Sequence, residues 1–207
     1  MYQSIIDALL DLDEEKVIIC VRQALESQMN AGDILNRGLI AGMDVVGDRM
    51  EKEEMFIPEV LKAAKIMGAA VQILKPLLTE DSSSSKGRIV IGTVKGDLHD
   101  IGKNLCAMMM ESAGLEVHDL GVDISPERFI EALRKTDSKI LCMSALLTTT
   151  MPMMKRTIDA LVESGLRKTV KVMVGGAPVT QNYANEIGAD AYAPDAGSAA
   201  KAARSII

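Results

Sequence analysis

The stretch that decides the fold is Arg88-Ile-Val-Ile-Gly-Thr-Val-Lys-Gly-Asp97-Leu-His99-Asp-Ile-Gly-Lys-Asn104. Its first part, residues 88–94, is a short apolar run rich in β-branched side chains, which is typical of a buried strand. Polar residues and glycines follow at once, and a helical pattern comes after them. The sequence therefore predicts a strand that ends in a polar loop, with the loop leading into a helix.

The same unit of strand and helix repeats through the rest of the chain. Further strands are expected at residues 115–120, 139–144 and 170–174, with a weaker one near 189–192, and helical segments separate them. Strands that alternate with helices over so few residues predict βαβ units and a parallel sheet with helices on both faces. We therefore expect a Rossmann-like (flavodoxin-like) doubly wound parallel five-stranded sheet over residues 88–207. In such sheets, ligands bind beyond the carboxyl ends of the strands.

Residues 1–80 have a different pattern, with helical periodicity and no strand-like alternation. Apolar side chains recur three or four positions apart between Ile34 and Val46, and two glycines, Gly38 and Gly42, lie among them. A helix with that pair of glycines can pack closely against a neighbour. The other helices are expected at about 2–10, 14–29 and 58–78, with Asp13 and Asp33 as caps and Pro58 near a helix start.

Four helices joined by short loops predict a small helical bundle, so the expected fold class is α + α/β. Residues 81–87 read Asp-Ser-Ser-Ser-Ser-Lys-Gly and have no apolar side chain to bury, which is typical of a linker. The sequence thus predicts a helical domain at residues 1–80, a linker at 81–87 and a ligand-binding sheet domain at 88–207.

Charge and composition limit the class of function. Residues 1–80 contain 14 acidic and 8 basic side chains, whereas residues 81–207 contain 15 of each, so the net charge of -6 comes from the first part. An acidic domain lacks the electrostatic footprint of a nucleic-acid-binding protein. The chain has no run of about eighteen apolar residues and no basic leader before an apolar segment, so we expect neither a membrane span nor export. The three cysteines are odd in number and far apart, which predicts a reducing cytoplasm.

Asp97 and His99 stand where the first predicted strand ends, which is where a ligand binds in a parallel sheet. A Walker-type phosphate loop is excluded, because five residues separate Gly96 from Gly102 and Asn104 replaces the required Ser or Thr. Zinc is also disfavoured, since the chain contains only two histidines. A single imidazole suits a metal whose other ligands come from a macrocycle, and Asp97 could accept a hydrogen bond from its second nitrogen. The alternative is that Asp97 caps a helix and His99 is an exposed loop residue.

Three short motifs follow three of the predicted strands in a fixed order. They are Asp97-x-His99-x-x-Gly102, then Ser144-x-Leu146, and then Gly175-Gly176. Together they resemble the cobalamin-binding signature shared by methionine synthase and corrinoid methyltransferase proteins. Residues 47–50 (Gly-Asp-Arg-Met) and 55–60 (Met-Phe-Ile-Pro-Glu-Val) resemble the helical cap domain of the same family. The resemblance covers nearly the whole chain, and the small corrinoid proteins of methylamine, methanol and methoxy-aromatic methyltransferase systems have the same two domains.

The resemblance implies a cobalamin or related corrinoid of the methylcobalamin type. In the family, the dimethylbenzimidazole tail is displaced from cobalt and a histidine takes its place. His99 is then the metal ligand, and Asp97 and Thr150 complete a hydrogen-bonded relay behind it. Relatives of the synthase type carry Ser at the position of Thr150, so a hydroxyl is kept. These three residues are the implied catalytic set.

Other residues match family positions that contact the corrinoid. Gly102 leaves room for the tail to enter, and Gly175 and Gly176 let the backbone approach it. Taken singly, each residue also has an ordinary explanation as a strand-end hydroxyl, a turn or a core-filling side chain. The remaining implied contacts are Gly96, Asp100, Ser144, Leu146, Thr148 and Ala196 in the sheet domain, and Met50, Ile57 and Val60 over the methyl face of the cofactor in the cap.

The implied function is that of a methyl carrier. Co(I) of the corrinoid accepts a methyl group from a substrate-specific methyltransferase and passes it to an acceptor methyltransferase that uses a folate or a thiol. A reductive activation protein is a third implied partner, and the chain is not expected to be catalytic alone. Two alternatives remain. One is a cobalamin-dependent sensor or regulator, for which no output module is visible, and the other is the cobalamin subunit of a radical mutase, which does not need a methyl-capping bundle.

Overall fold

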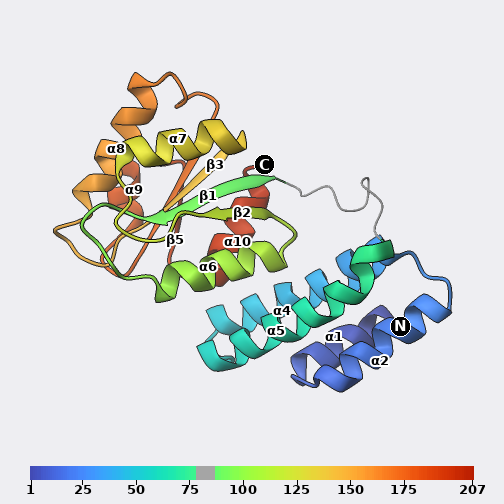
Figure 1. The fold of residues 1–207 in the computed structure, drawn as a ribbon. Helices are drawn as coiled ribbons and strands as arrows, with labels where there is room; N and C mark the ends of the chain where they lie inside the picture. Colours follow the sequence, from blue (N-terminus) through green and yellow to red (C-terminus); the bar gives the residue numbers. More distant parts are fainter. Residues whose placement is uncertain (78–86) are drawn as a thin grey trace. The chain divides into compact units, whose positions relative to one another are not determined.

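The computed structural model describes residues 1–77 and 87–207, which form two compact units (Figure 1). The first range contains a helical unit, and the second contains a unit with one sheet and its covering helices. The predicted linker, residues 81–87, falls outside the described residues except for Gly87. No helix in these two ranges is long and apolar enough to cross a membrane.

The helical unit is built from helices of unequal length, one of which has a π-helical segment in its middle. In chain order they are α1 (Tyr2–Leu10), α2 (Glu14–Glu26), α3 (Ala31–Asp33), the π-helical η1 (Ile34–Ile40), α4 (Ala41–Glu51), α5 (Ile57–Leu74) and the 3-10 turn η2 (Lys75–Leu77). Since α3, η1 and α4 follow one another without a break, these helices correspond to the four that the sequence predicts. Pro58 lies in the first turn of α5, as expected.

One of the two predicted caps is correct and the other is wrong. The Asp13 side chain caps α2, because it accepts a hydrogen bond from the Lys16 N–H at 3.0 Å. Asp33 does not cap a helix. The helix begins earlier, at Asn30, whose side-chain oxygen accepts from the N–H of Gly32 at 2.8 Å and of Asp33 at 3.2 Å. Both side chains can cap, so composition alone did not distinguish them.

The two glycines of the long helical stretch lie against α1, as the sequence predicts. A Cβ atom at Gly42 would lie 2.8 Å from Leu9 Cδ2, and one at Gly38 would lie 3.3 Å from Ile5 Cδ1. A larger side chain at either position would require the Leu9 or Ile5 side chain to move. The two glycines therefore lie at a close contact between the long helical stretch and α1.

The sheet unit has five parallel strands in the order β2-β1-β3-β4-β5. They are β1 (Arg88–Thr93), β2 (Glu116–Asp119), β3 (Ile140–Ser144), β4 (Lys171–Gly175) and β5 (Ala191–Ala193). This is the flavodoxin-like order. The predicted doubly wound five-stranded sheet is confirmed, and each strand limit lies within two residues of the expected one.

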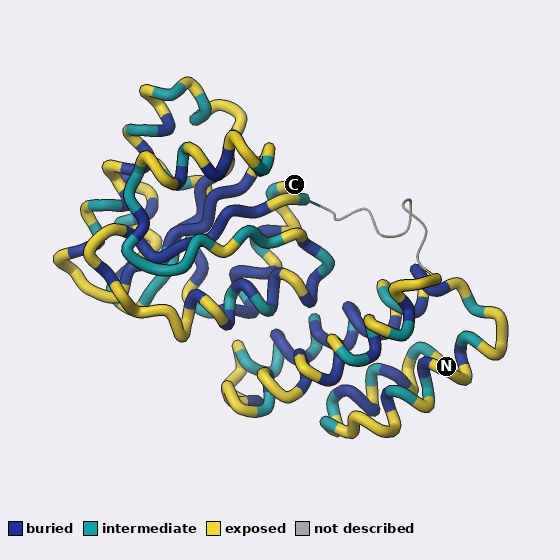
Figure 2. Tube along the Cα trace, viewed as in Figure 1, coloured by how far each residue is buried: buried dark blue, intermediate teal, exposed yellow. Residues whose placement is uncertain are grey.

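Five helices cover the faces of this sheet: α6 (Ile101–Ser112), α7 (Pro126–Thr136), α8 (Pro152–Glu163), α9 (Gln181–Ile187) and α10 (Ala196–Ser205). On one face, Phe129 of α7 and Ile158 of α8 pack with Val90 and Leu141 of the strands. α6 and α10 lie on the opposite face (Figure 1). The central strands are buried along most of their length (Figure 2), so a rigid apolar layer supports the loops at its edges.

Candidate functional site

The site lies where the strand order reverses. From β1 the chain crosses to β2 on one side, whereas from β3, on the other side of β1, it continues to β4. The loops after β1 and β3 therefore lie at the carboxyl ends of neighbouring strands, which is where ligands bind in such sheets. Residues 94–100 form the first loop and residues 145–151 the second. The implied catalytic set, Asp97, His99 and Thr150, lies within these two loops.

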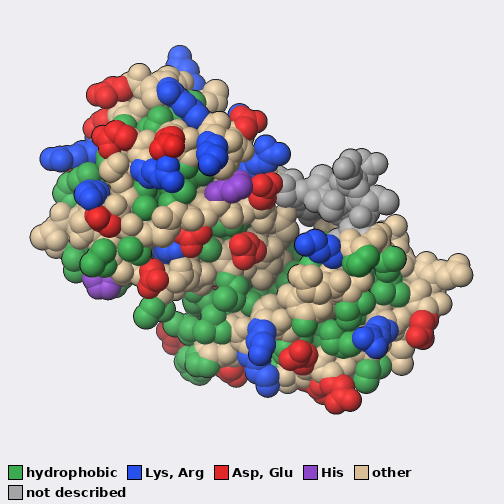
Figure 3. Space-filling view, in the orientation of Figure 1, with side chains coloured by type: hydrophobic (Ala, Val, Ile, Leu, Met, Phe, Trp, Pro, Cys, Tyr) green, Lys and Arg blue, Asp and Glu red, His purple; other side chains and the backbone are tan. Residues whose placement is uncertain are grey.

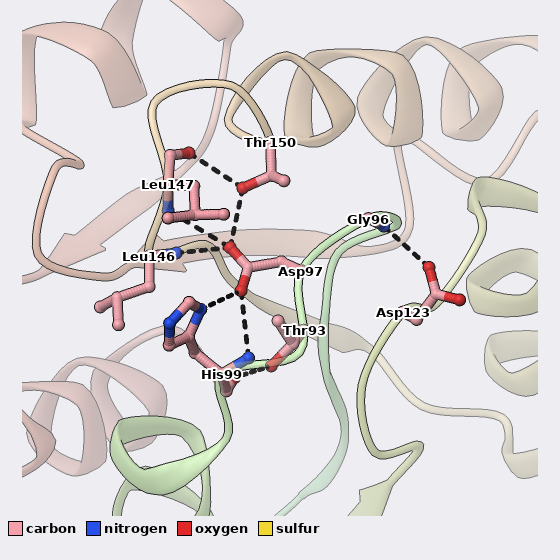
Figure 4. Close-up of polar contacts among 8 residues, drawn as sticks. All are labelled: Thr93, Gly96, Asp97, His99, Asp123, Leu146, Leu147 and Thr150. Carbon is pink, nitrogen blue, oxygen red and sulfur yellow. Dashed lines mark hydrogen bonds and ion pairs between the residues drawn. The ribbon is translucent and has the colours of Figure 1, made fainter.

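The Asp97 carboxylate joins the two loops and has no exposed surface. Its Oδ1 accepts a hydrogen bond from the His99 backbone N–H at 3.1 Å and lies 2.7 Å from His99 Nδ1. Its Oδ2 accepts from the backbone N–H groups of Leu146 at 2.8 Å and Leu147 at 3.3 Å, and from the Thr150 hydroxyl at 2.7 Å (Figure 4). The predicted contact between Asp97 and the second ring nitrogen of His99 is thus present.

These donors hold the Asp97 carboxylate in its ionised form. Burial acts to raise its pKa, but the hydrogen bonds from the Leu146 N–H, the Thr150 hydroxyl and His99 outweigh burial and hold the pKa of Asp97 well below its usual range. An anion beside Nδ1 fixes the tautomer of a neutral His99. Nδ1 carries the proton and donates a hydrogen bond to Asp97 Oδ1, which leaves the lone pair of Nε2 available to a metal.

Replacing the carboxylate in Asp97→Asn is expected to destabilise the protein by about 2–3 kcal/mol at neutral pH, because an amide turns an N–H toward groups that are themselves donors. The folded pKa of Asp97 lies below its unfolded value, so its stabilisation is complete above about pH 4 and is lost as the pH falls toward the folded pKa. The free energy of unfolding, measured with urea, should therefore differ less between wild type and Asp97→Asn below about pH 4 than at neutral pH. Asp159→Asn, in an exposed pair on α8, is the control. A difference that does not change with pH would contradict the assignment.

The surroundings of His99 suit a large apolar ligand. The His99 side chain is 49% exposed. Four apolar side chains in the same two loops and the first turn of α6 are also exposed, Leu98 at 73%, Ile101 at 75%, Leu146 at 41% and Leu147 at 42%. Hydrophobic side chains gather at this end of the sheet unit in Figure 3, beside one of the two histidines. Large exposed apolar side chains around a polar group indicate a surface that a ligand covers.

The donor set fits a metal that arrives with its own macrocycle. In residues 1–77 and 87–207, no three His, Cys, Asp or Glu side chains come together as a metal site. A metal at His99 would therefore have this imidazole as its protein ligand, and a macrocycle such as a corrin ring would have to supply the other nitrogen atoms. The residues present thus fit a corrinoid.

Gly102 leaves open space next to this site. A Cβ atom added there would meet no atom within 4 Å, and the backbone is not in the left-handed region. The fold itself therefore has no use for glycine, although glycine in a helix costs about 1 kcal/mol relative to alanine. Entry of the corrinoid tail through this space remains a prediction.

Gly175 and Gly176 have a role in the fold itself. A Cβ atom at Gly175 would lie 2.8 Å from the Ala193 carbonyl oxygen, and one at Gly176 would lie 1.9 Å from the Ala145 carbonyl oxygen. Gly176 also has a φ of +126°, which is strained for any residue with a side chain. Both glycines are needed for backbone packing at the edge of the sheet, and their contact with the corrinoid tail remains a prediction.

The other predicted contact residues lie at several places. Ser144 ends β3, Thr148 is exposed in the next loop, and the buried Ala196 begins α10. Gly96 donates its N–H to Asp123 Oδ1 at 2.8 Å, and Asp100 Oδ2 accepts from Asn104 at 3.1 Å. In the helical unit, Ile57 is 44% exposed, Met50 is half-buried and Val60 has no exposed surface, which is the burial that the core-filling alternative predicts for Val60.

Four groups that hold the site were not found from the sequence. The Leu146 and Leu147 N–H groups bind Asp97, but a backbone donor leaves no mark in the sequence. The Thr93 hydroxyl donates to the His99 carbonyl oxygen at 2.8 Å. The Asp123 N–H donates to the Asp97 carbonyl oxygen at 3.0 Å. A polar residue at a buried strand end was the available signal for Thr93.

Two models of known protein families together match nearly the whole chain. Residues 87–204 match the model of a B12 binding domain, and residues 1–75 match a second model that is also described as a B12 binding domain. Dimethylamine corrinoid protein 1 of Methanosarcina acetivorans is 42% identical over 100% of this chain and 97% of its own length.

Solved structures are similar over the whole chain. A cobalamin-binding protein from Desulfitobacterium hafniense has a TM-score of 0.88 and 34% identity, covering 100% of this chain and 98% of that one. The methanol:cobalamin methyltransferase complex from Methanosarcina barkeri has a TM-score of 0.81 and 30% identity, covering 99% of this chain and 78% of that one. The chain therefore belongs to the B12-binding domain family, as its three motifs predicted.

Proposed function

We propose that this protein is a corrinoid methyl carrier in which His99 binds cobalt in place of the displaced dimethylbenzimidazole tail. The observation that carries the proposal is the Asp97 carboxylate at the switch point, which bonds to His99 Nδ1 on one side and to the Thr150 hydroxyl on the other. The bound corrinoid supplies the chemistry, since its Co(I) state accepts a methyl group from one enzyme and gives it up to another.

The hydrogen bonds among Asp97, His99 and Thr150 determine where a proton binds when His99 binds or leaves cobalt. Asp97 holds His99 at Nδ1, which would leave Nε2 to bind cobalt, and Asp97 stays ionised because its pKa is held low. If His99 were released from a metal, a proton would bind at Nε2, because Nδ1–H already faces Asp97, and the resulting imidazolium would face that anion. The Thr150 hydroxyl lies 2.7 Å from Asp97 Oδ2 and 2.9 Å from the Leu147 carbonyl oxygen. It can therefore donate its hydrogen bond to either acceptor as the charge on His99 changes.

Other proteins complete the reaction. Methyl groups on amines or ethers are poor substrates until an acid or a cation activates them, and the described residues hold no second cluster suited to that task beside Asp97, His99 and Thr150. A donor methyltransferase, an acceptor methyltransferase with folate or thiol, and a reductive activation protein are the proposed partners. The likeness to a dimethylamine corrinoid protein and to a methanol:cobalamin methyltransferase complex supports the first of these.

The two domains have separate proposed roles. Residues 88–207 bind the corrinoid and its tail, with Gly102, Ser144, Leu146 and Thr148 along the path. Residues 1–80 form a cap that shields the methyl face with Met50, Ile57 and Val60 and moves aside for each partner. The helical domain itself matches a B12 binding model, and a radical mutase subunit does not need such a cap. The three free cysteines agree with a proposed cytoplasmic location.

Reduced holo-protein tests the carrier function. After uptake of about one hydroxocobalamin and reduction, the Co(I) absorption band should persist when dimethylamine, methanol or methoxy-aromatic compounds are added alone. Adding the cognate donor methyltransferase should remove the band at least about 100-fold faster, because that enzyme activates the leaving group. Rapid loss of Co(I) without a second protein would instead make this chain a complete methyltransferase. Activity only with adenosylcobalamin would favour the mutase subunit.

A further inference from the structure

Lys103 is a buried cation that the proposed mechanism does not use. Its side chain is 1% exposed, and its Nζ forms an ion pair with the Asp119 carboxylate at the end of β2. The same Nζ donates to the side-chain oxygen of Asn104 at 2.6 Å. Lysine is almost never fully buried unless it is paired, because its charge loses hydration. A buried ion pair adds little stability compared with apolar residues of the same shape, so stability alone does not explain this one.

A chain of hydrogen bonds leads from this ion pair to the backbone of His99. Asp119 Oδ1 accepts from the Gly121 N–H at 2.8 Å, and the Gly121 carbonyl oxygen accepts from the Thr93 N–H at 3.0 Å. The Thr93 hydroxyl then donates to the His99 carbonyl oxygen at 2.8 Å (Figure 4). Thr93 has no exposed surface, so water does not compete for its bonds. The ion pair is therefore connected to the residue that carries the imidazole.

A second branch reaches the residue after His99. Asn104 donates from its side-chain amide to Asp100 Oδ2 at 3.1 Å, while its own side-chain oxygen is held by Lys103. The Asn104 backbone N–H also donates to the Asp100 carbonyl oxygen at 2.7 Å. Both branches begin at the Lys103 ammonium, and they hold the loop at two consecutive residues.

We propose that Lys103 is a positioning residue for the cobalt ligand. It acts through Asp119, Gly121 and Thr93 on one branch and through Asn104 on the other. The inference rests on the proposed function of His99. Asp97 orients the imidazole ring, whereas the Lys103 network fixes the backbone from which the ring projects. A metal ligand must be held to within about 0.5 Å of its working position, and this requires both restraints.

Lys103→Met tests the proposal in the full chain, because methionine replaces the unbranched stem of lysine without its ammonium group and suits a buried place. In the apo-protein, amide hydrogen exchange at His99, whose N–H donates to Asp97, should become at least tenfold faster, while exchange in β4 stays unchanged. In the corrinoid-loaded Co(II) form, the ratio of histidine-bound to histidine-free cobalt should fall about tenfold by electron paramagnetic resonance, which is about 1.4 kcal/mol. Lys155→Met, in a pair on α8 with a 48% exposed lysine, is the matched control and should change neither.

The outcomes separate this inference from the proposed function. The positioning role is overturned if Lys103→Met has the same amide exchange rate at His99 and the same fraction of histidine-bound cobalt as wild type. If wild type itself shows no histidine on cobalt, the proposed function fails, and faster exchange at His99 in the variant still supports the restraint on the loop. Should Lys103→Met not fold, Asp119→Asn breaks the same ion pair at a carboxylate that is 36% exposed. That variant must show the faster exchange, and unchanged exchange overturns the proposal.

Discussion

The His99→Ala variant is expected to lose all nitrogen hyperfine splitting from histidine in the Co(II) electron paramagnetic resonance spectrum, while its corrinoid affinity stays within about tenfold of wild type. The splitting depends on a nitrogen bonded to cobalt, and Nε2 of His99 is the one proposed for it. Affinity should change less, because the tail and the apolar surface around His99 supply further contacts. The His99 side chain is 49% exposed, so its removal leaves the fold intact.

Two controls make this result specific. Protein with histidine labelled by nitrogen-15 should show doublets where unlabelled protein shows triplets, since the two isotopes differ in nuclear spin. His118→Ala removes the other histidine, which lies on β2 with Nε2 3.1 Å from Glu116 Oε1, and should leave the spectrum unchanged. If the spectrum of the labelled wild-type protein still shows triplets, the nitrogen on cobalt does not come from histidine. That result would exclude His99 as the ligand and favour the corrinoid's own base.

The Gly102→Leu variant is expected to fold normally but to bind corrinoid about ten to a hundred times more weakly. The space around Gly102 is open, with no atom within 4 Å of an added Cβ, so the apo-protein tolerates a side chain. The corrinoid tail is proposed to use that space. Overfilling a packed site costs about 1–3 kcal/mol, which corresponds to this loss of affinity. Gly102→Ala should give a smaller loss, because its side chain is shorter.

Gly68→Leu provides the matched control for this experiment. Gly68 is also a helical, exposed glycine with no atom within 4 Å of an added Cβ, but it lies in α5. Circular dichroism and thermal melting should show both leucine variants folded, and titration with hydroxocobalamin should separate them. Normal uptake by Gly102→Leu would show that the tail does not pass beside the start of α6.

The sequence predicted the architecture because apolar patterns determine it. Each strand is a short run bounded by polar residues, and the helices have clear periodicity, so the order of elements followed directly. The prediction that Asp33 caps a helix was wrong because Asn30, three residues earlier, has an equally suitable side chain. The π-helical segment Ile34–Ile40 was not predicted either, since it keeps the same apolar spacing as an ordinary helix.

The sequence predicted which side chains form the site, but not the backbone groups that hold them. The motif residues Asp97 and His99 pointed to the cofactor through a resemblance, and Thr150 was placed beside them in the same way. The bonds from Leu146 and Leu147 to Asp97 arise from backbone groups, whose partners depend on how two loops meet in space. In the same way, Lys103 and Asp119 are sixteen residues apart in sequence and come together only once α6 and β2 are folded.

The bridge that Asp97 makes between its two loops has a consequence for the kinetics and entropy of cofactor capture. Ordering a residue's backbone costs about 1–2 kcal/mol, and in this protein the segments on either side of the switch point are joined through the Asp97 carboxylate, a group of the protein itself. Their conformational entropy is therefore lost during folding rather than during association. Corrinoid then meets a preorganised surface, and its association rate should be set by diffusion and by entry of the tail instead of by loop rearrangement.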